Sequence, residues 1–300
     1  MTNRREFLVR AGGSAAVLAA PASWSTVALA QEMLPTRPIP GTNDSLPIVG
    51  LGNARVFAEN DMAASMSVVR QFADRGGRYI DCHGLSRFVV AEVTKALGAS
   101  NELFLGTYFS NEEEPVMREN IQRILEITGK DQLDLIHGWT EWAVPNWDIL
   151  RKWKDEGLTR YIGVSRHNKK YYDDMMGLMG TGTVDFVQVN YSALEREAEE
   201  RILPMAMDMG IAANINRPFI NGDYFGLVSD HELPEWAAEF NCFSWAQFSL
   251  KFILSHPAVN CVLTETSNPD HAIDNISAGF GGMPDTETRE RIFAHLQSLR

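Results

Sequence analysis

Cysteine is scarce in this sequence of 300 residues, which contains only Cys82, Cys242 and Cys261. Because the three are odd in number and far apart, they do not suggest a disulfide framework, and no zinc or haem spacing appears. We expect Cys242 and Cys261 to be small buried apolar residues. Low-complexity segments, internal repeats and an interdomain linker are also absent, which favours one domain over a string of modules.

Long apolar runs are lacking as well. The weakly apolar stretch over residues 11–20 is interrupted by Gly12 and Gly13 and followed by Pro21. A membrane-spanning helix needs roughly 20 apolar residues, so this stretch is too short to be an anchor. No later segment is long and apolar enough either, and we expect no membrane span.

The residues around that stretch predict a twin-arginine signal peptide over residues 1–30. Arg4 and Arg5 precede an apolar pair, and residues 28–30 form the small-residue cleavage site Ala-Leu-Ala. The twin-arginine export machinery, which carries proteins that have already folded, is thus an expected partner. We expect a periplasmic or otherwise exported bacterial protein whose single mature domain covers residues 31–300.

Basic residues are few in the predicted mature domain. The first thirty residues hold three Arg and one Glu, which leaves 24 basic and 38 acidic residues and a formal charge of −14. An acidic surface argues against nucleic acid or anionic lipid as the main partner. A small-molecule substrate or ligand is the better expectation.

Short apolar runs alternate with helix-period segments along the mature chain, a pattern typical of βα repeats that form one parallel sheet. Eight such runs and about 270 residues suit a (β/α)₈ TIM barrel. The predicted strands are Pro47 to Leu51, Tyr79 to Cys82, Leu103 to Thr107, Leu133 to His137, Arg160 to Val164, Phe186 to Asn190, Ile211 to Ile215 and Val259 to Leu263.

Apolar stripes at helical spacing lie between these runs, and we expect them to face the core. They are Met117, Ile121 and Ile124; Ile202, Met205, Ala206 and Met209; and Ile292, Phe293 and Leu296. In a barrel of this kind the chemistry lies at the carboxyl ends of the strands, so the residues that end each strand are the candidates for function.

At these positions the sequence resembles the aldo/keto reductase family, and the resemblance runs from about residue 37 to about residue 284. Residues 46–52 (LPIVGLG) look like the family's first strand, and residues 154–165 (KDEGLTRYIGVS) look like the entry to its fifth. Residues 184–192 (VDFVQVNYS) are similar to the sixth strand, and residues 264–275 resemble the loop that holds the adenosine phosphate. The segments resemble most a subgroup exported by the twin-arginine route.

The resemblance implies an NAD(P)H-linked oxidoreductase that acts on a carbonyl compound. In the family a Tyr gives the oxygen a proton, a Lys paired with an Asp lowers the pKa of that Tyr, and a His orients the substrate. Asp81 matches the Asp. Ser86 and Arg87 stand where the family has its Tyr, and Tyr108 stands where it has its Lys.

The position of the family's His is ambiguous in this sequence. Counting from Asp134 without a gap places Trp139 there, whereas a two-residue deletion places His137 there. A shift of two residues keeps the facing of a strand side chain, so both alignments are physically sensible. We favour His137.

The missing Tyr and Lys allow three explanations. In the first, the chain is catalytically inactive, a possible pseudoenzyme that binds a small ligand or a protein partner. In the second, Tyr108 supplies the proton from a new position beside Asp81, with help from His83 or His137. In the third, the chain catalyses a different reaction. A serine cannot replace a tyrosine as proton donor, because its pKa is far higher.

The resemblance also implies a site for NADP or NAD, in which Ser165 and Gln188 contact the nicotinamide carboxamide. The loop after residue 264 has no Lys or Arg to pair with the 2′-phosphate of NADPH, so we expect weak binding with little preference for NADPH. A plain turn and helix cap would explain its Ser, Thr and Asn residues equally well. The remaining candidate cofactor residues are Asn216, Arg217, Gly222, Thr266, Ser267, Asn268, His271 and Asn275.

The signal peptide can be tested by replacing both Arg4 and Arg5 with Lys. Because the twin-arginine machinery recognises the arginine pair, the variant should stay in the cytoplasm while the wild-type chain is exported. Cell fractionation followed by immunoblotting measures the split. Export of the variant at the wild-type level would rule out this route.

Overall fold

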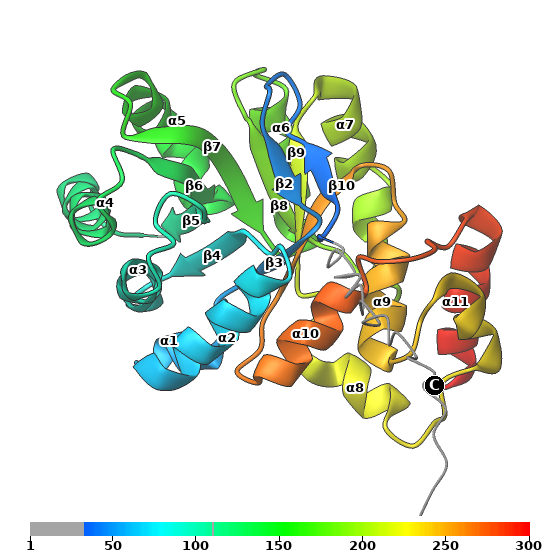
Figure 1. Cartoon of the computed structure of the whole chain (residues 1–300). Coiled ribbons are helices and arrows are strands. Elements are labelled where there is room, and N and C mark those ends of the chain that lie inside the picture. Colours follow the sequence, from blue (N-terminus) through cyan, green and yellow to red (C-terminus); the bar gives the residue numbers. More distant parts are fainter. Residues whose placement is uncertain (1–32, 110) are drawn as a thin grey trace, which may run out of the picture. The chain divides into compact units, whose positions relative to one another are not determined.

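The computed structural model describes residues 33–109 and 111–300, and the predicted signal peptide lies outside these ranges. Eight parallel strands close a barrel in the order β10-β3-β4-β5-β6-β7-β8-β9 (Figure 1), which confirms the predicted TIM barrel. The strands are β3 (Val49–Leu51), β4 (Tyr79–His83), β5 (Phe104–Phe109), β6 (Leu133–Trp139), β7 (Thr159–Arg166), β8 (Phe186–Asn190), β9 (Ala212–Asn216) and β10 (Val259–Thr264).

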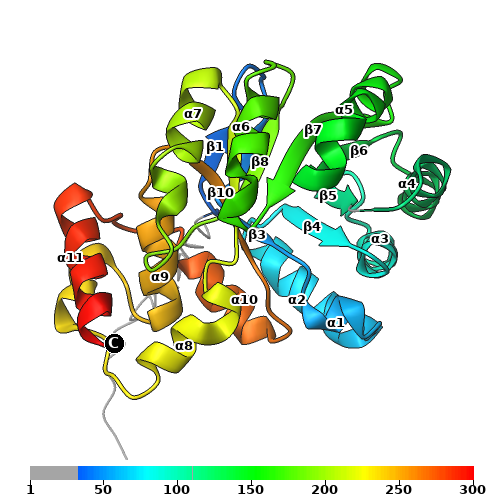
Figure 2. The ribbon, with the colours of Figure 1, turned by 180° about the vertical axis from the view of Figure 1, so that it is seen from behind.

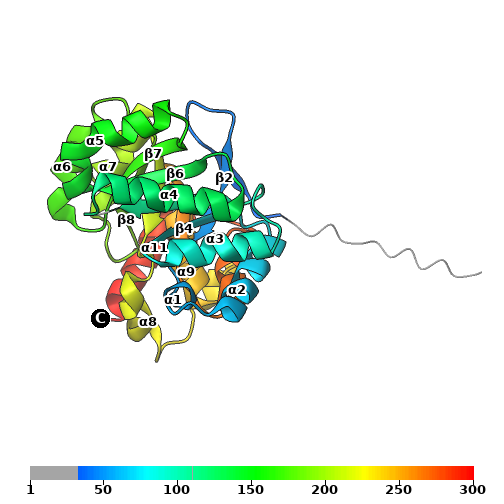
Figure 3. The ribbon, with the colours of Figure 1, turned by 90° about the vertical axis from the view of Figure 1, so that its left-hand side faces the viewer.

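Helices cover the outside of this barrel. Figure 2 shows them from behind, and Figure 3 shows α3 and α4 lying side by side. The helices are α1 (Arg55–Ala58), α2 (Met62–Asp74), α3 (Ser86–Ala96), α4 (Glu114–Thr128), α5 (Thr140–Asp155), α6 (Tyr172–Met179), α7 (Ile202–Met209), α8 (Asp223–Val228), α9 (Trp245–Leu254), α10 (Pro269–Ser277) and α11 (Thr286–Ser298). Within the described ranges, no helix has the length and apolar character that crossing a membrane requires.

The predicted apolar stripes are confirmed on α4, where Met117, Ile121 and Ile124 are buried. On α7 the prediction was wrong at one position, because Met209 is 39% exposed. That helix ends at Gly210, which adopts a left-handed conformation with φ of 65°. The chain therefore leaves the helix before the stripe can continue over Met209.

A hairpin that the sequence analysis did not predict closes the amino-terminal end of the barrel. It consists of β1 (Thr36–Pro38) and β2 (Ser45–Pro47), which pair antiparallel. Its apolar side chains Ile39 and Leu46 are buried against the lowest inward-facing residues of the barrel. Pro47, predicted to begin the first barrel strand, belongs to this hairpin instead.

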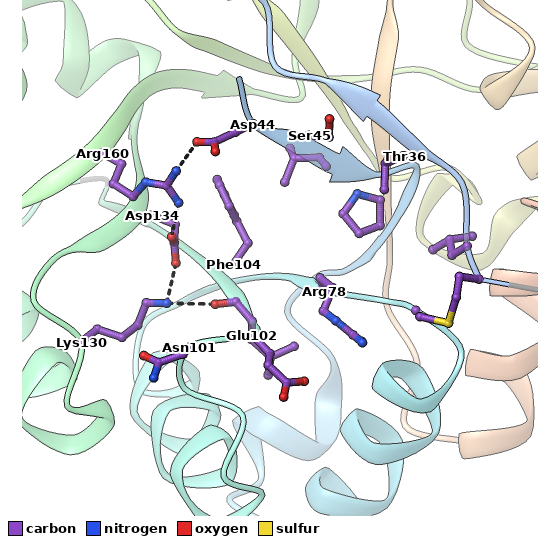
Figure 4. A pocket seen from close by; sticks show the side chains of 16 residues that line it. Thr36, Asp44, Ser45, Arg78, Asn101, Glu102, Phe104, Lys130, Asp134 and Arg160 are labelled. Carbon is purple, nitrogen blue, oxygen red and sulfur yellow. Dashed lines mark hydrogen bonds and ion pairs between the residues drawn. The ribbon is translucent and has the colours of Figure 1, made fainter. Parts of the chain in front are cut away.

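A cavity of about 360 Å³ lies between the hairpin and the barrel (Figure 4). Four of the charged side chains that line it form ion pairs with one another. Lys130 Nζ and Arg160 Nη1 each lie 3.0 Å from a carboxylate oxygen of Asp134, and Arg160 also pairs with Asp44. Because this is the amino-terminal end of the strands, we assign these charges to stability and not to chemistry.

The barrel interior is built in layers whose facing follows from the alternation of side chains along each strand. The lowest layer is apolar and includes Tyr79, Leu135 and Phe186. The inward-facing positions two residues further on are polar on four strands: Asp81 on β4, His137 on β6, Gln188 on β8 and Asn214 on β9.

Glycines on neighbouring strands make room for two of these polar side chains. A Cβ atom added to Gly106 would lie 2.6 Å from Asp81 Oδ1, and one added to Gly163 would lie 2.3 Å from His137 Nδ1. Both separations are shorter than a non-bonded contact permits. The close approach of Asp81 and His137 to the next strand therefore depends on having no side chain at these glycines.

The substitution Gly163→Ala should destabilise the fold by about 1–3 kcal/mol, because the new methyl group displaces the His137 ring in a packed interior. Urea unfolding followed by circular dichroism measures this. Gly177→Ala is the matched control: Gly177 is exposed on α6 with no atom within 4 Å of the added Cβ. That change should stabilise the protein by about 0.5–1 kcal/mol. Equal effects of the two substitutions would contradict the packing argument.

Candidate functional site

The carboxyl ends of the barrel strands bring together polar and aromatic side chains, which we call the mouth of the barrel. Each lies two residues beyond an inward-facing residue of the middle layer. They are His83 on β4, Tyr108 on β5, Trp139 on β6, Ser165 on β7, Asn190 on β8 and Asn216 on β9. Glu265 follows directly after β10 and lies against Gly52. A Cβ atom added to Gly52 would lie only 2.9 Å from Glu265 Cγ, so the close approach depends on glycine at this position.

Asp81 lies one layer below the mouth and is 1% exposed. Its Oδ2 accepts a hydrogen bond from Gln188 Nε2, and its Oδ1 has no hydrogen-bond partner among the described residues. Within the same residues, Asp81 forms no ion pair with Lys, Arg or His. Burial raises the pKa of Asp81 to about 7, although the hydrogen bond from Gln188 and the nearby Tyr79 hydroxyl group oppose the rise. Asp81 can therefore carry a proton near neutral pH.

Tyr108 stands at the mouth next to Asp81, on the adjacent strand. Its ring lies 4.5 Å from that of His83 and 6.1 Å from that of Trp139, measured between ring centroids. Burial raises the pKa of Tyr108 well above its ordinary value, and the negative charges of Asp81 and Glu265 add to the rise. The hydroxyl group thus stays protonated and is available as a hydrogen-bond donor.

His137, proposed from the sequence for the substrate-orienting role, is completely buried in the middle layer of the barrel. Neither ring nitrogen has a partner within the described residues, and burial lowers its pKa to about 3. Trp139 is the residue of β6 that reaches the mouth, where the Arg166 guanidinium lies 4.3 Å from its ring. A catalytic role for His137 stays a prediction, and the structure places it away from the mouth.

Ser86 and Arg87, which stand at the family's Tyr position, belong to the first turn of α3 and are both buried. The Arg87 guanidinium lies 4.5 Å from the centre of the Phe109 ring and 3.1 Å from Glu112 Oε1. Because side chains alternate along β5, Phe109 faces outward where Tyr108 faces inward. Arg87 therefore packs between α3 and the outer face of the barrel and leaves the mouth open.

The residues expected to contact a nicotinamide carboxamide lie together, Ser165 at the mouth and Gln188 in the layer below it. Ser165 Oγ donates to Gln188 Oε1 over 2.8 Å, and Asn216 Nδ2 donates to the same oxygen over 3.3 Å. Asn216 Oδ1 is buried and has no hydrogen-bond partner among the described residues. An amide group of a ligand could supply the missing donor, because a buried acceptor is costly without one.

The loop that follows β9 is strained. Arg217, Ile220 and Asn221 have φ angles of 52°, 52° and 55°, in the left-handed region. Asparagine tolerates this region, but a β-branched residue such as Ile220 adopts it rarely, at a cost of roughly 1–3 kcal/mol. Such strain concentrates where a ligand is held. This loop was expected at the carboxyl end of a barrel strand and, by resemblance, beside the cofactor, but no residue pattern indicated its strain.

Two adjoining cavities run from this loop to the loop after β10, with volumes of about 350 and 420 Å³. They share three lining residues: Phe219, Phe225 and Glu265. Of the sequence-predicted residues, Arg217, Gly222, Thr266, His271 and Asn275 line these cavities. The aromatic lining residues Phe225 and Trp245 were missed because they do not end barrel strands.

Ser267 and Asn268 have structural roles in this loop. Ser267 Oγ accepts a hydrogen bond of 3.1 Å from the backbone N–H of Val56. Asn268 is the N-cap of α10, and its side chain accepts from the N–H of Asp270 over 2.9 Å. The helix-cap interpretation thus accounts for Asn268, whereas Ser267 links this loop to α1.

Comparisons with known proteins agree with this geometry. The aldo/keto reductase family model matches residues 48–290. An aldo-keto reductase of Mycolicibacterium vanbaalenii is 30% identical over 150 residues, which cover 45% of this chain and 51% of that protein. The NADH-specific methylglyoxal reductase of Escherichia coli is 28% identical over 127 residues, covering 39% of this chain and 37% of the enzyme. The matched segments thus span about half or less of these two relatives.

A solved structure extends the fold comparison over most of the chain. The aldo-keto reductase of Klebsiella pneumoniae in complex with NADPH is similar with a TM-score of 0.68 and 20% identity. The similarity covers 87% of this chain and 93% of that protein. At this level of identity the similarity establishes the shared fold.

The state of Asp81 predicts how stability depends on pH. An unfolded Asp ionises near pH 4, whereas folded Asp81 holds its proton to about pH 7, so the free energy of unfolding falls between these values. Asp81→Asn removes that fall and keeps an acceptor for Gln188. The stability difference, variant minus wild type, should therefore grow by about 2–3 kcal/mol from pH 5 to pH 8 in urea unfolding. A difference independent of pH would show that Asp81 is not a buried acid.

Proposed function

The chain belongs to the aldo/keto reductase family, and we propose on this basis that it is an NAD(P)H-linked oxidoreductase of a carbonyl compound with an atypical proton-transfer centre. The observation that carries the proposal is that Asp81 lies one layer below Tyr108 on the adjacent strand and accepts a hydrogen bond from Gln188, which itself accepts from Ser165 and Asn216. A buried acid without a cation is costly, and such groups cluster at functional sites.

The residues at the mouth fit a nicotinamide cofactor. Asn216 offers an unpaired buried acceptor to the carboxamide, and the strained loop at residues 217–222 with the two cavities beside it would hold the rest of the dinucleotide. When bound, the cofactor supplies a hydride with its electron pair to the carbonyl carbon. Glu265 lines both cavities and lacks a Lys or Arg neighbour in its own loop, so NADH and NADPH should bind with similar and modest affinity.

The proton for the carbonyl oxygen must come from this chain or from water. The Tyr108 hydroxyl lies at the mouth and keeps its proton, so it donates a hydrogen bond to the oxygen and then the proton itself as negative charge develops there. Asp81, with its pKa near neutrality, restores the proton to Tyr108 from below. The hydride and this proton together convert the carbonyl compound into an alcohol.

The main alternative is a catalytically inactive barrel that binds a small ligand or a partner. Such a binder has no use for an acid whose proton is exchanged near pH 7, whereas a reductase needs one.

We also propose that the chain reaches the periplasm by the twin-arginine route, because Arg4 and Arg5 precede the apolar stretch. Export after folding would allow a cofactor to cross the membrane inside the protein.

Replacing Tyr108 with Phe removes the hydroxyl group and keeps the ring stack with His83 and Trp139. If Tyr108 donates the proton, kcat/KM for reduction of aldehydes should fall about 10²–10⁴-fold. In the wild type, kcat/KM should fall as the pH rises above about 7, where Asp81 loses its proton. Steady-state assays of cofactor oxidation measure both effects.

The control for this experiment distinguishes the two functions. If the wild type is inactive, the double variant Ser86→Tyr with Tyr108→Lys restores the family's residue types and should recover turnover. Recovery in that variant alone would favour the inactive barrel. Wild-type reduction of aldehydes that survives Tyr108→Phe would exclude Tyr108 as the donor.

A further inference from the structure

Gln188 makes an unusual contact for a residue at the cofactor end of the site. Its Nε2 donates to Asp81 Oδ2, across the barrel interior from β8 to β4. Gln188 is 3% exposed and Asp81 is 1% exposed, so water does not compete for this hydrogen bond. In the family, by the resemblance, a lysine on the next strand is the partner of this Asp, and here that position is Tyr108.

The orientation of the Gln188 amide is held by two donors. Ser165 Oγ and Asn216 Nδ2 both donate to Oε1, over 2.8 and 3.3 Å. Oε1 is therefore the acceptor end of the amide, and the Nε2 end must face Asp81. A carbonyl oxygen has two lone pairs, and both are used, so turning the amide over would remove the acceptor that both groups share.

This fixed amide distinguishes the two oxygens of Asp81. Oδ2 accepts from Nε2 and cannot at the same time carry a proton toward it. Oδ1 has no hydrogen-bond partner among the described residues, and it lies in the space left by Gly106, where an added Cβ would be 2.6 Å away. Tyr108 is the inward-facing residue next above Gly106 on β5.

We propose that Gln188 replaces the absent lysine as the partner of Asp81, and that it orients the carboxyl group so that Oδ1 holds the proton passed toward Tyr108. Gln188 is thus a positioning residue that acts through Asp81. A neutral amide serves this role where a lysine could not, because an ammonium group would keep Asp81 ionised at neutral pH. The inference rests on the proposed function only for the destination of the proton.

Several titratable groups lie around Asp81, and each can contribute to the pH dependence of the free energy of unfolding. Tyr79 lies below it on β4, Cys82 follows it, Tyr108 approaches from β5, and Glu265 and Cys261 approach from β10 and its loop. Burial raises the pKa of each of these five groups. Among them only Glu265 has an ordinary pKa below 7, and comparison of variants that keep Glu265 removes its contribution.

The test uses Gln188→Met in the full chain, which keeps the length of the side chain and removes the donor. The free energy of unfolding is measured from pH 5 to pH 9 for the chain with Asp81 and for its Asp81→Asn counterpart. The difference in the free energy of unfolding between the two chains changes with pH and becomes constant above the pKa of Asp81. We call the pH at which it becomes constant the levelling point. A donor to a carboxylate favours its charged form, so in the Gln188→Met background the difference should level off about one pH unit higher.

Thr128→Val is the matched background for loss of a buried hydrogen bond elsewhere, since Thr128 Oγ1 donates to Ile124 O over 2.8 Å on α4. It should lower stability at every pH without moving the levelling point. Gln188→Lys should move that point below its wild-type position, because the ammonium group stabilises the ionised carboxylate. An unmoved levelling point in Gln188→Met, with a uniform loss of stability, would overturn the inference.

The outcomes keep this inference separate from the proposed function. A shifted levelling point in a chain without reductase activity would support the role of Gln188 and reject the oxidoreductase. Reductase activity with an unmoved levelling point would support the oxidoreductase and reject the role of Gln188. Where activity is present, the pH at which kcat/KM falls should shift with the levelling point in the same variant.

Discussion

Within the described part of the chain, the Asp81 carboxyl group lies inside the barrel with no cation paired to it, and the side chains around it accommodate this group. An ionised Asp81 would cost free energy in an apolar interior. The carboxyl group therefore holds its proton up to about pH 7. Gln188 donates a hydrogen bond from a neutral amide, and Tyr79 lies below the carboxyl group. Gly106 leaves room for it because it has no side chain. A lysine in place of Gln188 would keep the Asp81 carboxyl group ionised at neutral pH.

The barrel separates stability from chemistry along its axis. The amino-terminal end is closed by an apolar hairpin and by charges that neutralise one another around Asp134. The carboxyl-terminal end holds unpaired polar atoms, a strained loop and two cavities. Such features cost stability, so a fold that contains them in one place must gain stability elsewhere.

Much of the fold follows from the sequence because most barrel strands are short apolar runs, and five of the eight end in a polar residue. The pattern could not predict the hairpin, whose strands have three residues each and include Pro38 and Pro47. The site was only partly accessible to the same reasoning. Asp81 was identified by resemblance, but its hydrogen bond to Gln188 joins residues 107 positions apart, and no local pattern contains such a pair. The burial of His137 likewise depends on Gly163 of the next strand.

The hairpin also has a kinetic consequence. Arg37 donates to the backbone carbonyl groups of Leu254, His256 and Val259, more than 200 residues later in the chain, and β3 pairs with β10. Contacts of such high sequence separation form late, because the loop they close must first be ordered. The barrel can close only after the chain up to Thr264 has left the ribosome. Closure of this seam thus follows the synthesis of all eight barrel strands, which suits a protein that we propose to be exported only once folded.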